Sequence, residues 1–324
     1  MKIIVWILII TQVFIIIFLG LFILRKKYPK ITPIKRVDII RTPNKKLQYF
    51  YEPIPNRTIK EEIWAPSMAT YLHNKDSLNE AKNYSNKKAK DVFRIITLGD
   101  SFTYGLFVNT KQNWTEVLES QLNKCHIKSN DYQYEVINLG VPGYDLQYSV
   151  SRYYKRGVKY NADMIIWFIK DDDFVHLNDQ MLKYVRDYET QPDSQLINLT
   201  GATEIFQYKV EKGYKAWEYA INKVASNISD ANKLSIQFDI IQQLIDNYSG
   251  NVVFMTLSST KSKYLKPLKR YIAHKSNLYL FDRLDIYDNE SLFFPSDGHP
   301  TIAGHLSIAA KLFNYLKFKR LIKC

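Results

Sequence analysis

The amino-acid sequence predicts an α/β protein, a three-layer α/β/α sandwich around a mainly parallel five-stranded sheet, preceded by one transmembrane helix. Five short apolar runs, each of strand length, predict the sheet. Their residues are almost all apolar and do not alternate with polar ones, which is typical of strands covered on both faces. Segments with helical periodicity lie between the runs, and this alternation of strands and helices predicts a layered βαβ architecture.

The predicted strands and helices follow one another from residue 92 to the C-terminus. We expect strands at 92–99, 135–141, 163–169, 251–257 and 277–283. We expect a helix at 231–248, where apolar residues recur on one helical face, and further helices at 113–124 and 301–319. Residues from about 175 to 230 are helix-prone and contain little strand signal. They predict a helical insertion between the third and fourth strands, which could cap a site at the strand ends.

Residues 1–24 predict an uncleaved membrane anchor. Between residues 3 and 24 only Thr11 and Gln12 are polar, and a helix of this length crosses a hydrocarbon core of about 30 Å. A cleaved signal peptide is the alternative, but its apolar region should be shorter and should end in small residues. Here the apolar run ends in Arg-Lys-Lys, which favours an anchor.

The basic charge of the chain is concentrated directly after this anchor. Residues 25–60 contain eleven Lys/Arg and two Asp/Glu, so they account for +9 of the net charge of +13. This placement predicts a stalk attracted to anionic lipid headgroups, and it argues against a nucleic-acid partner. We divide the chain into the anchor, a basic stalk and irregular N-terminal segment (25–90, with Pro53, Pro55 and Pro66), and a globular domain (91–324).

Two arguments about the side of the membrane on which the globular domain lies oppose each other. An N-terminal anchor before a large domain commonly exports that domain, so we expect a single-pass protein with an extracytoplasmic domain. The positive-inside rule favours the opposite orientation, because more Lys and Arg follow the helix than precede it. The two cysteines, Cys125 and Cys324, predict neither a disulfide framework nor a metal site.

Polar or glycine-rich clusters follow the first three predicted strands and precede the last helix. They are Gly99-Asp100-Ser101, residues 138–144 (NLGVPGY), residues 170–173 (KDDD) and residues 295–305 (PSDGHPTIAGH). Because ligands bind outside the carboxyl ends of the strands in open α/β sheets, we expect the four clusters to converge on one site there.

These clusters resemble the motifs of the SGNH/GDSL hydrolase superfamily. The resemblance rests on Gly-Asp-Ser at 99–101, Asn-x-Gly-x-x-Gly-Tyr at 138–144 and Asp-Gly-His-Pro at 297–300, and it extends over residues 70–320 in order and spacing. It implies the flavodoxin-like fold of that superfamily and a serine hydrolase activity that needs no cofactor or metal. Consecutive Asp171, Asp172 and Asp173 are not expected to face one metal ion.

The resemblance implies a role for each site residue. Ser101 would be the nucleophile and His299 the base that takes its proton, because a serine hydroxyl needs such a base to react. Asp297 would hold the His299 tautomer and stabilise the imidazolium. The backbone N–H groups of Ser101 and Gly140 would stabilise the oxyanion, and Asp172 stands where the family has a third donor.

Two positions depart from the family pattern. The third donor is usually an asparagine, whereas an ionised Asp172 only accepts hydrogen bonds and would repel an oxyanion. The acid of the triad usually lies three residues before the histidine, whereas Asp297 lies two before His299. Elsewhere, we expect His305 to be a packed residue and not a base, and Asn138 to stabilise its loop. The aromatic residues are mostly core, and Tyr144 is the one candidate among them for lining a pocket.

The combined reading is a membrane-anchored serine esterase that forms an acyl-enzyme on Ser101. The resemblance implies an acyl-ester substrate, such as an acetyl group on a cell-envelope carbohydrate or a lipid. Two alternatives stay open. An O-acyltransferase would use the same site with a sugar hydroxyl in place of water, and a non-catalytic envelope binding or assembly protein would carry a degenerate site, for which Asp172 is the main argument.

Overall fold

The computed structural model describes residues 39–41, 47–61, 66–126, 133–191, 202–257, 262–282, 284–286, 289–295 and 297–324. The predicted membrane anchor, residues 1–24, and the stalk up to residue 38 lie outside these ranges. Among the helices of the described ranges, none combines the length and apolar character that a bilayer span requires.

The centre of the molecule is the predicted five-stranded sheet, and all of its strands are parallel. Its spatial order is β6-β5-β7-β8-β9, so the first strand of the sheet lies inside it and the second at its edge. The five strands are β5 (Val92–Leu98), β6 (Gln133–Asn138), β7 (Met164–Ile169), β8 (Asn251–Thr256) and β9 (Leu278–Phe281). Each of them begins within two residues of its expected position.

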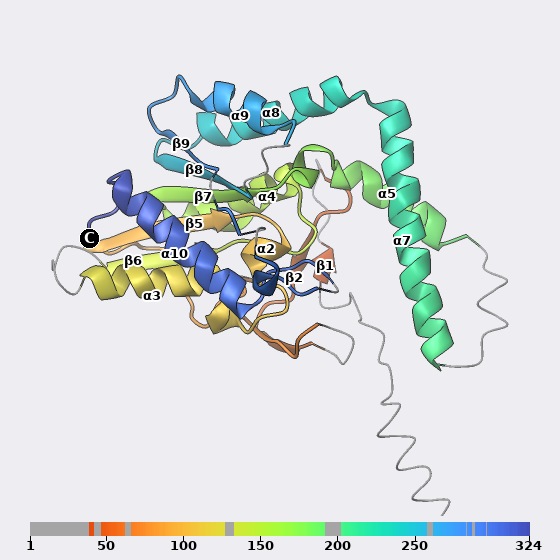
Figure 1. Ribbon diagram of the computed structural model, residues 1–324, viewed down its shortest axis with the longest axis horizontal. Coiled ribbons are helices and arrows are strands. Elements are labelled where there is room, and N and C mark those ends of the chain that lie inside the picture. Colours follow the sequence, from red (N-terminus) through yellow and green to blue (C-terminus); the bar gives the residue numbers. More distant parts are fainter. Residues whose placement is uncertain are drawn as a thin grey trace, which may run out of the picture.

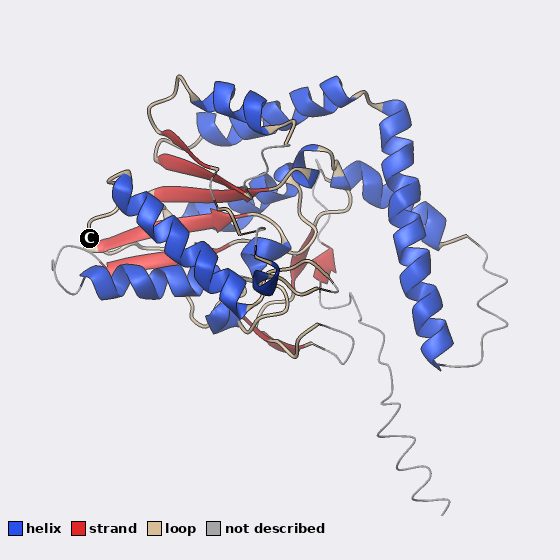
Figure 2. Ribbon diagram, in the orientation of Figure 1, coloured by secondary structure: helices blue, strands red, loops and turns tan. Residues whose placement is uncertain are grey.

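Helices cover both faces of the sheet, which confirms the three-layer prediction (Figures 1 and 2). One face packs against α3 (Trp114–His126) and α10 (Ile302–Phe318). The other packs against α4 (Leu146–Arg152), α8 (Asp230–Asp246) and α9 (Leu265–Ile272).

The strands supply side chains to both cores, because successive residues of a strand point to opposite faces. Ile95 lies in the core with α3 and α10, and Ile96 lies in the core with α4 and α8. Both residues are fully buried. This double burial is the physical reason for the continuous apolar runs of the sequence.

The predicted insertion is helical and consists of α5 (Asn178–Glu189) and α7 (Ala202–Asn227). Met181 and Val185 of α5 pack against Ala216 and Ala220 of α7 in a small core of their own. Figure 1 shows α7 crossing α5 and set apart from the sheet, on the side toward which the strands point. Short turns of helix complete the chain: α2 (Ser101–Tyr104), η2 (Thr110–Gln112), η3 (Tyr153–Gly157), η4 (Val158–Tyr160), η5 (Asp172–Phe174) and η6 (Glu290–Leu292).

The segment 47–90 is more ordered than the expected irregular stalk. It contains β2 (Tyr51–Pro53), which pairs antiparallel with β1 (Ile39–Arg41), and a hairpin of β3 (Arg57–Lys60) and β4 (Thr70–His73). Strand β2 ends at its proline, so the proline shortens the strand without excluding it.

Glu52 attaches this segment to the α/β domain. Its carboxylate is buried and accepts hydrogen bonds from Arg152 and Arg156, with Lys155 also in ion-pair contact. Burial opposes ionisation of Glu52, but the hydrogen bond from Arg156 and the charge of Arg152 outweigh it and lower its pKa to about 2. The segment is therefore part of the folded domain. The ion pairs of Glu52 hold it there, and no local sequence pattern predicts them.

The two cysteines form a disulfide, which corrects the expectation from their number. Cys125 lies near the end of α3 and Cys324 is the last residue, and their Cα atoms are 5.4 Å apart. The pairing depends on the packing of α3 beside α10, which brings residues 199 positions apart into contact. A count of two cysteines carries no information about such a long-range contact.

Candidate active site

Ser101 lies at the carboxyl end of β5, at the first position of α2. Gly99 makes the turn between them with φ of 146°, and a Cβ there would lie 2.4 Å from Thr103 Oγ1. Only glycine fits this turn without strain. Asp100 caps α2 by accepting a hydrogen bond from the N–H of Phe102 at 2.9 Å. The Gly-Asp-Ser sequence therefore ends the strand, starts the helix and fixes the place of the serine.

His299 reaches Ser101 from the loop before α10. Its Nε2 atom lies 2.7 Å from Ser101 Oγ, across 198 positions of sequence. Its Nδ1 atom contacts Asp297 Oδ1, and its backbone N–H also donates to that oxygen at 3.3 Å. With the Nδ1 proton directed at Asp297, Nε2 is the acceptor for the Ser101 hydroxyl. The structure thus brings Ser101, His299 and Asp297 together in the order that nucleophile activation requires, even with the short spacing of the acid.

Aromatic rings surround the imidazole of His299. The ring of Phe102 lies 5.2 Å from it, and the ring of Phe107 lies 5.3 Å from it at 88°. His305, by contrast, is fully buried, and its Nδ1 accepts the N–H of Trp114 at 3.1 Å. Burial, with a smaller contribution from the charge of His299, lowers the pKa of His305 to about 3. His305 is therefore a packed neutral residue, as expected.

Gly140 lies against α2, as the oxyanion prediction requires. A Cβ at Gly140 would lie 2.5 Å from the backbone nitrogen of Tyr104, so only glycine permits this approach. Its N–H donates to Asn138 Oδ1 at 2.9 Å, and Asn138 Nδ2 donates to the carbonyl of Thr103 at 2.9 Å. Asn138 thus stabilises the loop, as predicted, but it also engages one of the two expected oxyanion donors.

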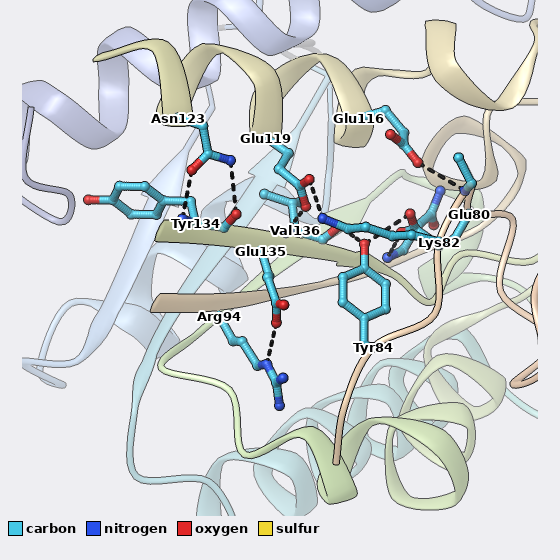
Figure 3. A network of polar contacts seen from close by, with 12 residues as sticks. Glu80, Lys82, Tyr84, Arg94, Glu116, Glu119, Asn123, Tyr134, Glu135 and Val136 are labelled. Carbon is cyan, nitrogen blue, oxygen red and sulfur yellow. Dashed lines mark hydrogen bonds and ion pairs between the residues drawn. The ribbon is translucent and has the colours of Figure 1, made fainter. Parts of the chain in front are cut away.

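Glu80 stabilises the loop of Gly140, and no sequence pattern indicated it as a site residue. Glu80 is buried, and its Oε1 accepts the backbone N–H of Asn138 at 2.6 Å. Figure 3 shows Glu80 in a polar network with Tyr84, Glu116 and Glu119 beside β6. Burial, and then the charge of Glu116, raise the pKa of Glu80 well above its ordinary value. Glu80 lies in the segment expected to be irregular, and no motif distinguishes it from other surface-type residues.

Asp172 does not take the place of the missing amide donor. Its Oδ2 accepts from Lys170 Nζ at 3.0 Å, and the same ammonium lies 2.8 Å from Asp100 Oδ2. Burial disfavours the charged form of Lys170, but the carboxylates, Asp100 first, outweigh it and raise the pKa of Lys170 above its ordinary range. The departure from the family pattern at position 172 is therefore seen in the structure as well, where this carboxylate accepts a hydrogen bond from a lysine.

The carboxylates around Lys170 form one cluster. Ligand atoms of Asp100, Asp172 and Asp173 lie within 4.8 Å of one another. The Asp173 carboxylate accepts the backbone N–H of Lys170 at 2.7 Å, and burial followed by the charges of Asp100 and Asp172 raises its pKa well above the ordinary value. An ammonium group already bridges two of these carboxylates, so the cluster carries its own cation.

Tyr144 is buried, whereas it was the aromatic candidate for lining a pocket. Its hydroxyl donates to the carbonyl of Tyr51, and its ring packs against those of Phe50, Tyr51 and Tyr148. The segment from Leu47 to Pro53 covers it. The sequence pattern placed Tyr144 at the strand ends correctly, but it did not show that the N-terminal segment lies over this position.

No protein-family model matches the chain, and no curated protein matches it. Among solved structures, it is similar to a member of the lipolytic protein G-D-S-L family from Veillonella parvula, with 15% identity over 69% of this chain and 98% of that one, at a TM-score of 0.38. It is similar to a family 3 carbohydrate esterase from Clostridium thermocellum, with 14% identity over 72% and 100% of the two chains, at 0.40. A lipase/acylhydrolase from Enterococcus faecalis matches with 13% identity over 71% and 97%, at 0.37.

Proposed function

We propose that this chain is a serine hydrolase of the SGNH/GDSL type that cleaves an ester through an acyl-enzyme on Ser101. The observation that carries the proposal is the line of contacts from Ser101 Oγ to His299 Nε2, and from His299 Nδ1 to Asp297. A base within hydrogen-bond reach of a hydroxyl, itself oriented by a carboxylate, is the arrangement that activates a serine nucleophile.

The reaction follows from the direction of these hydrogen bonds. Ser101 Oγ attacks the ester carbonyl carbon while its proton moves to His299 Nε2, and Asp297 stabilises the resulting imidazolium. The N–H of Ser101 lies in the first turn of α2, where N–H groups have no intrahelical acceptor, and it supplies an oxyanion donor. When the tetrahedral intermediate collapses, His299 gives its proton to the leaving alcohol oxygen. Water then attacks the acyl-enzyme by the same route and frees Ser101.

The membrane anchor and the envelope substrate are part of the same proposal. Residues 3–24 would hold the chain in the membrane, the basic stalk would lie against the headgroups, and the domain would be extracytoplasmic. The path of the chain supports a site close to the membrane. Tyr51, in the segment that follows the predicted anchor, donates its hydroxyl to the carbonyl of Pro142, near the strand ends where Ser101 lies. An acyl or acetyl ester of an envelope carbohydrate or lipid would suit such a position.

Two experimental results would assign the chain to another class. Binding of an ester without its hydrolysis would identify a binding protein with a degenerate site, an alternative that the engaged N–H of Gly140 and the carboxylate at position 172 favour. Transfer of the acyl group from Ser101 to an added sugar, in preference to water, would identify an O-acyltransferase.

Protease accessibility of the domain in intact cells, compared with spheroplasts, tests on which side of the membrane the domain lies.

The central test is covalent labelling of the full-length chain in detergent with a fluorophosphonate probe. We expect the probe to label Ser101 and the chain to hydrolyse p-nitrophenyl acetate, and Ser101→Ala to abolish labelling and lower kcat by at least about 10³-fold. Ser226→Ala, at an exposed serine of α7, is the matched control and should do neither. Equal hydrolysis by the chain and Ser101→Ala would overturn the proposal.

A further inference from the structure

Phe107 has an unusual backbone conformation beside the candidate base. Its φ is 67°, in the left-handed region that glycine adopts readily and bulky residues avoid. It follows Gly105, which ends α2, by only two residues. Strained residues of this kind persist where the surrounding structure holds them, and they concentrate at functional sites.

Contacts from the β3–β4 hairpin hold Phe107 in this conformation. Its N–H donates to the hydroxyl of Tyr71 at 2.7 Å, and that hydroxyl donates in turn to Glu61 Oε1 at 2.8 Å. Tyr71 is buried, and its ring lies 5.1 Å from that of Tyr104 at the end of α2. The strained residue is thus fixed by a side chain of β4, on the segment that was expected to be irregular.

The ring of Phe107 faces the imidazole of His299 and not the hydrophobic core. It is half-buried, it meets the His299 ring edge-on at 5.3 Å, and it lies 6.2 Å from the ring of Phe294 at 90°. Two aromatic rings therefore stand together on the imidazole side of the Ser101–His299 pair.

The position of these rings relative to the base decides which half of an ester they meet. His299 Nε2 delivers its proton to the leaving oxygen, so the alcohol portion of the substrate must lie on the imidazole side. We propose that Phe107, with Phe294, forms the wall that contacts the alcohol portion and favours alcohols with a flat ring face, a sugar or an aryl group. The inference rests on the proposed esterase function and names a specificity-determining residue for it.

The test uses a variant that fits the backbone. Phe107→Gly removes the ring and suits φ of 67°, so the fold should be retained, and Phe107→Leu keeps apolar area without a flat face. The readout is the ratio of kcat/KM for a ring acetate to kcat/KM for ethyl acetate, with phenyl acetate and an acetylated methyl glucoside as the two ring esters. We expect Phe107→Gly to lower this ratio roughly tenfold, and Phe107→Leu to lower it less.

Whichever ring ester shows the larger fall identifies the alcohol class. Phe318→Leu, at an exposed phenylalanine at the end of α10, is the control and should leave the ratio unchanged. An equal loss with all acetates in Phe107→Gly would overturn the proposal, because it would mean that the ring only orients His299. A change in the preference between p-nitrophenyl acetate and butyrate would overturn it too, by placing the ring on the acyl side. Absence of Ser101 labelling in the unmutated chain would instead defeat the proposed function itself.

Discussion

Within the candidate site, the side that activates Ser101 and the side that should bind the oxyanion differ in their contacts. On the activating side, each atom faces the partner that the chemistry needs, with Ser101 Oγ 2.7 Å from His299 Nε2 and Nδ1 directed at Asp297. On the oxyanion side, the N–H of Gly140 faces Asn138 Oδ1, and Asp172 is bound to Lys170. Under the proposed function, nucleophile activation and charge stabilisation would therefore depend on different parts of the site.

The physical origin of the difference is the number of charges on each side. The activating side has one carboxylate, held by an imidazole two residues away. The oxyanion side has three carboxylates and one ammonium, and their net charge is negative even when Asp173 is protonated. A developing oxyanion gains least where negative charge already gathers. We therefore expect substitutions on the activating side to abolish activity, and substitutions on the oxyanion side to tune it.

Removing the base should have the largest effect. His299→Ala leaves no acceptor for the Ser101 proton, so kcat for p-nitrophenyl acetate should fall by about 10⁴-fold or more. Steady-state kinetics measures this, and His274→Ala, at an exposed histidine after α9, is the control. A loss of less than tenfold would show that another group takes the proton.

Neutralising Asp297 tests whether the short spacing gives a working triad. Asp297→Asn should lower kcat on the order of 10³- to 10⁴-fold, because an amide cannot stabilise the imidazolium and can favour the wrong tautomer. Asp285→Asn, at a carboxylate in a nearby loop, is the matched control. Activity retained within a factor of two would mean that a different carboxylate orients His299.

Restoring the amide should sharpen the contrast from the oxyanion side. Asp172→Asn removes a negative charge and introduces a donor group, so we expect kcat to rise about tenfold or more. Asp171→Asn is the neighbouring control, because Asp171 instead accepts a hydrogen bond from Ser262. A fall in kcat for Asp172→Asn alone would show that the carboxylate contributes to turnover and would contradict the expected effect of its charge.

The smallest effect concerns stability and not turnover. The pKa of His305 is about 3 in the folded chain, below its ordinary value of 6.5, so the unfolded chain binds the extra proton between these values. The contribution of neutral His305 is thus fully present above pH 6.5 and is lost as the pH falls toward 3, by about 3 kcal/mol at pH 4.

His305→Asn keeps an acceptor for the N–H of Trp114 but cannot titrate. Urea unfolding at pH 7 and pH 4 should therefore show a smaller acid-induced loss for His305→Asn than for the unmutated chain. His274→Asn is the exposed control. An identical loss in His305→Asn and in the unmutated chain would contradict the assignment.

Several elements of this molecule follow from local sequence. The strands follow from continuous apolar runs such as 164–169, because burial on both faces leaves no polar position. The turn at Gly99 and the cap at Asp100 are local as well, so the place of Ser101 could be predicted from three residues. The Asp-Gly-His-Pro motif is local as well, so the position of His299 before the last helix could be predicted from the sequence.

Other features depend on contacts between distant segments, which a local pattern does not encode. Glu80 reaches Asn138, Tyr71 holds Phe107, and Cys125 meets Cys324 only after the sheet and its helices have assembled. The contact of Lys170 with Asp100, 70 positions away, is of this kind too, because hydrogen bonds and ion pairs depend on distances of about 3 Å. The sequence by itself determined the fold class and the candidate nucleophile and base, since both follow from hydrophobic pattern and short motifs. Only the tertiary structure decided how the oxyanion side is occupied and which aromatic rings border the base.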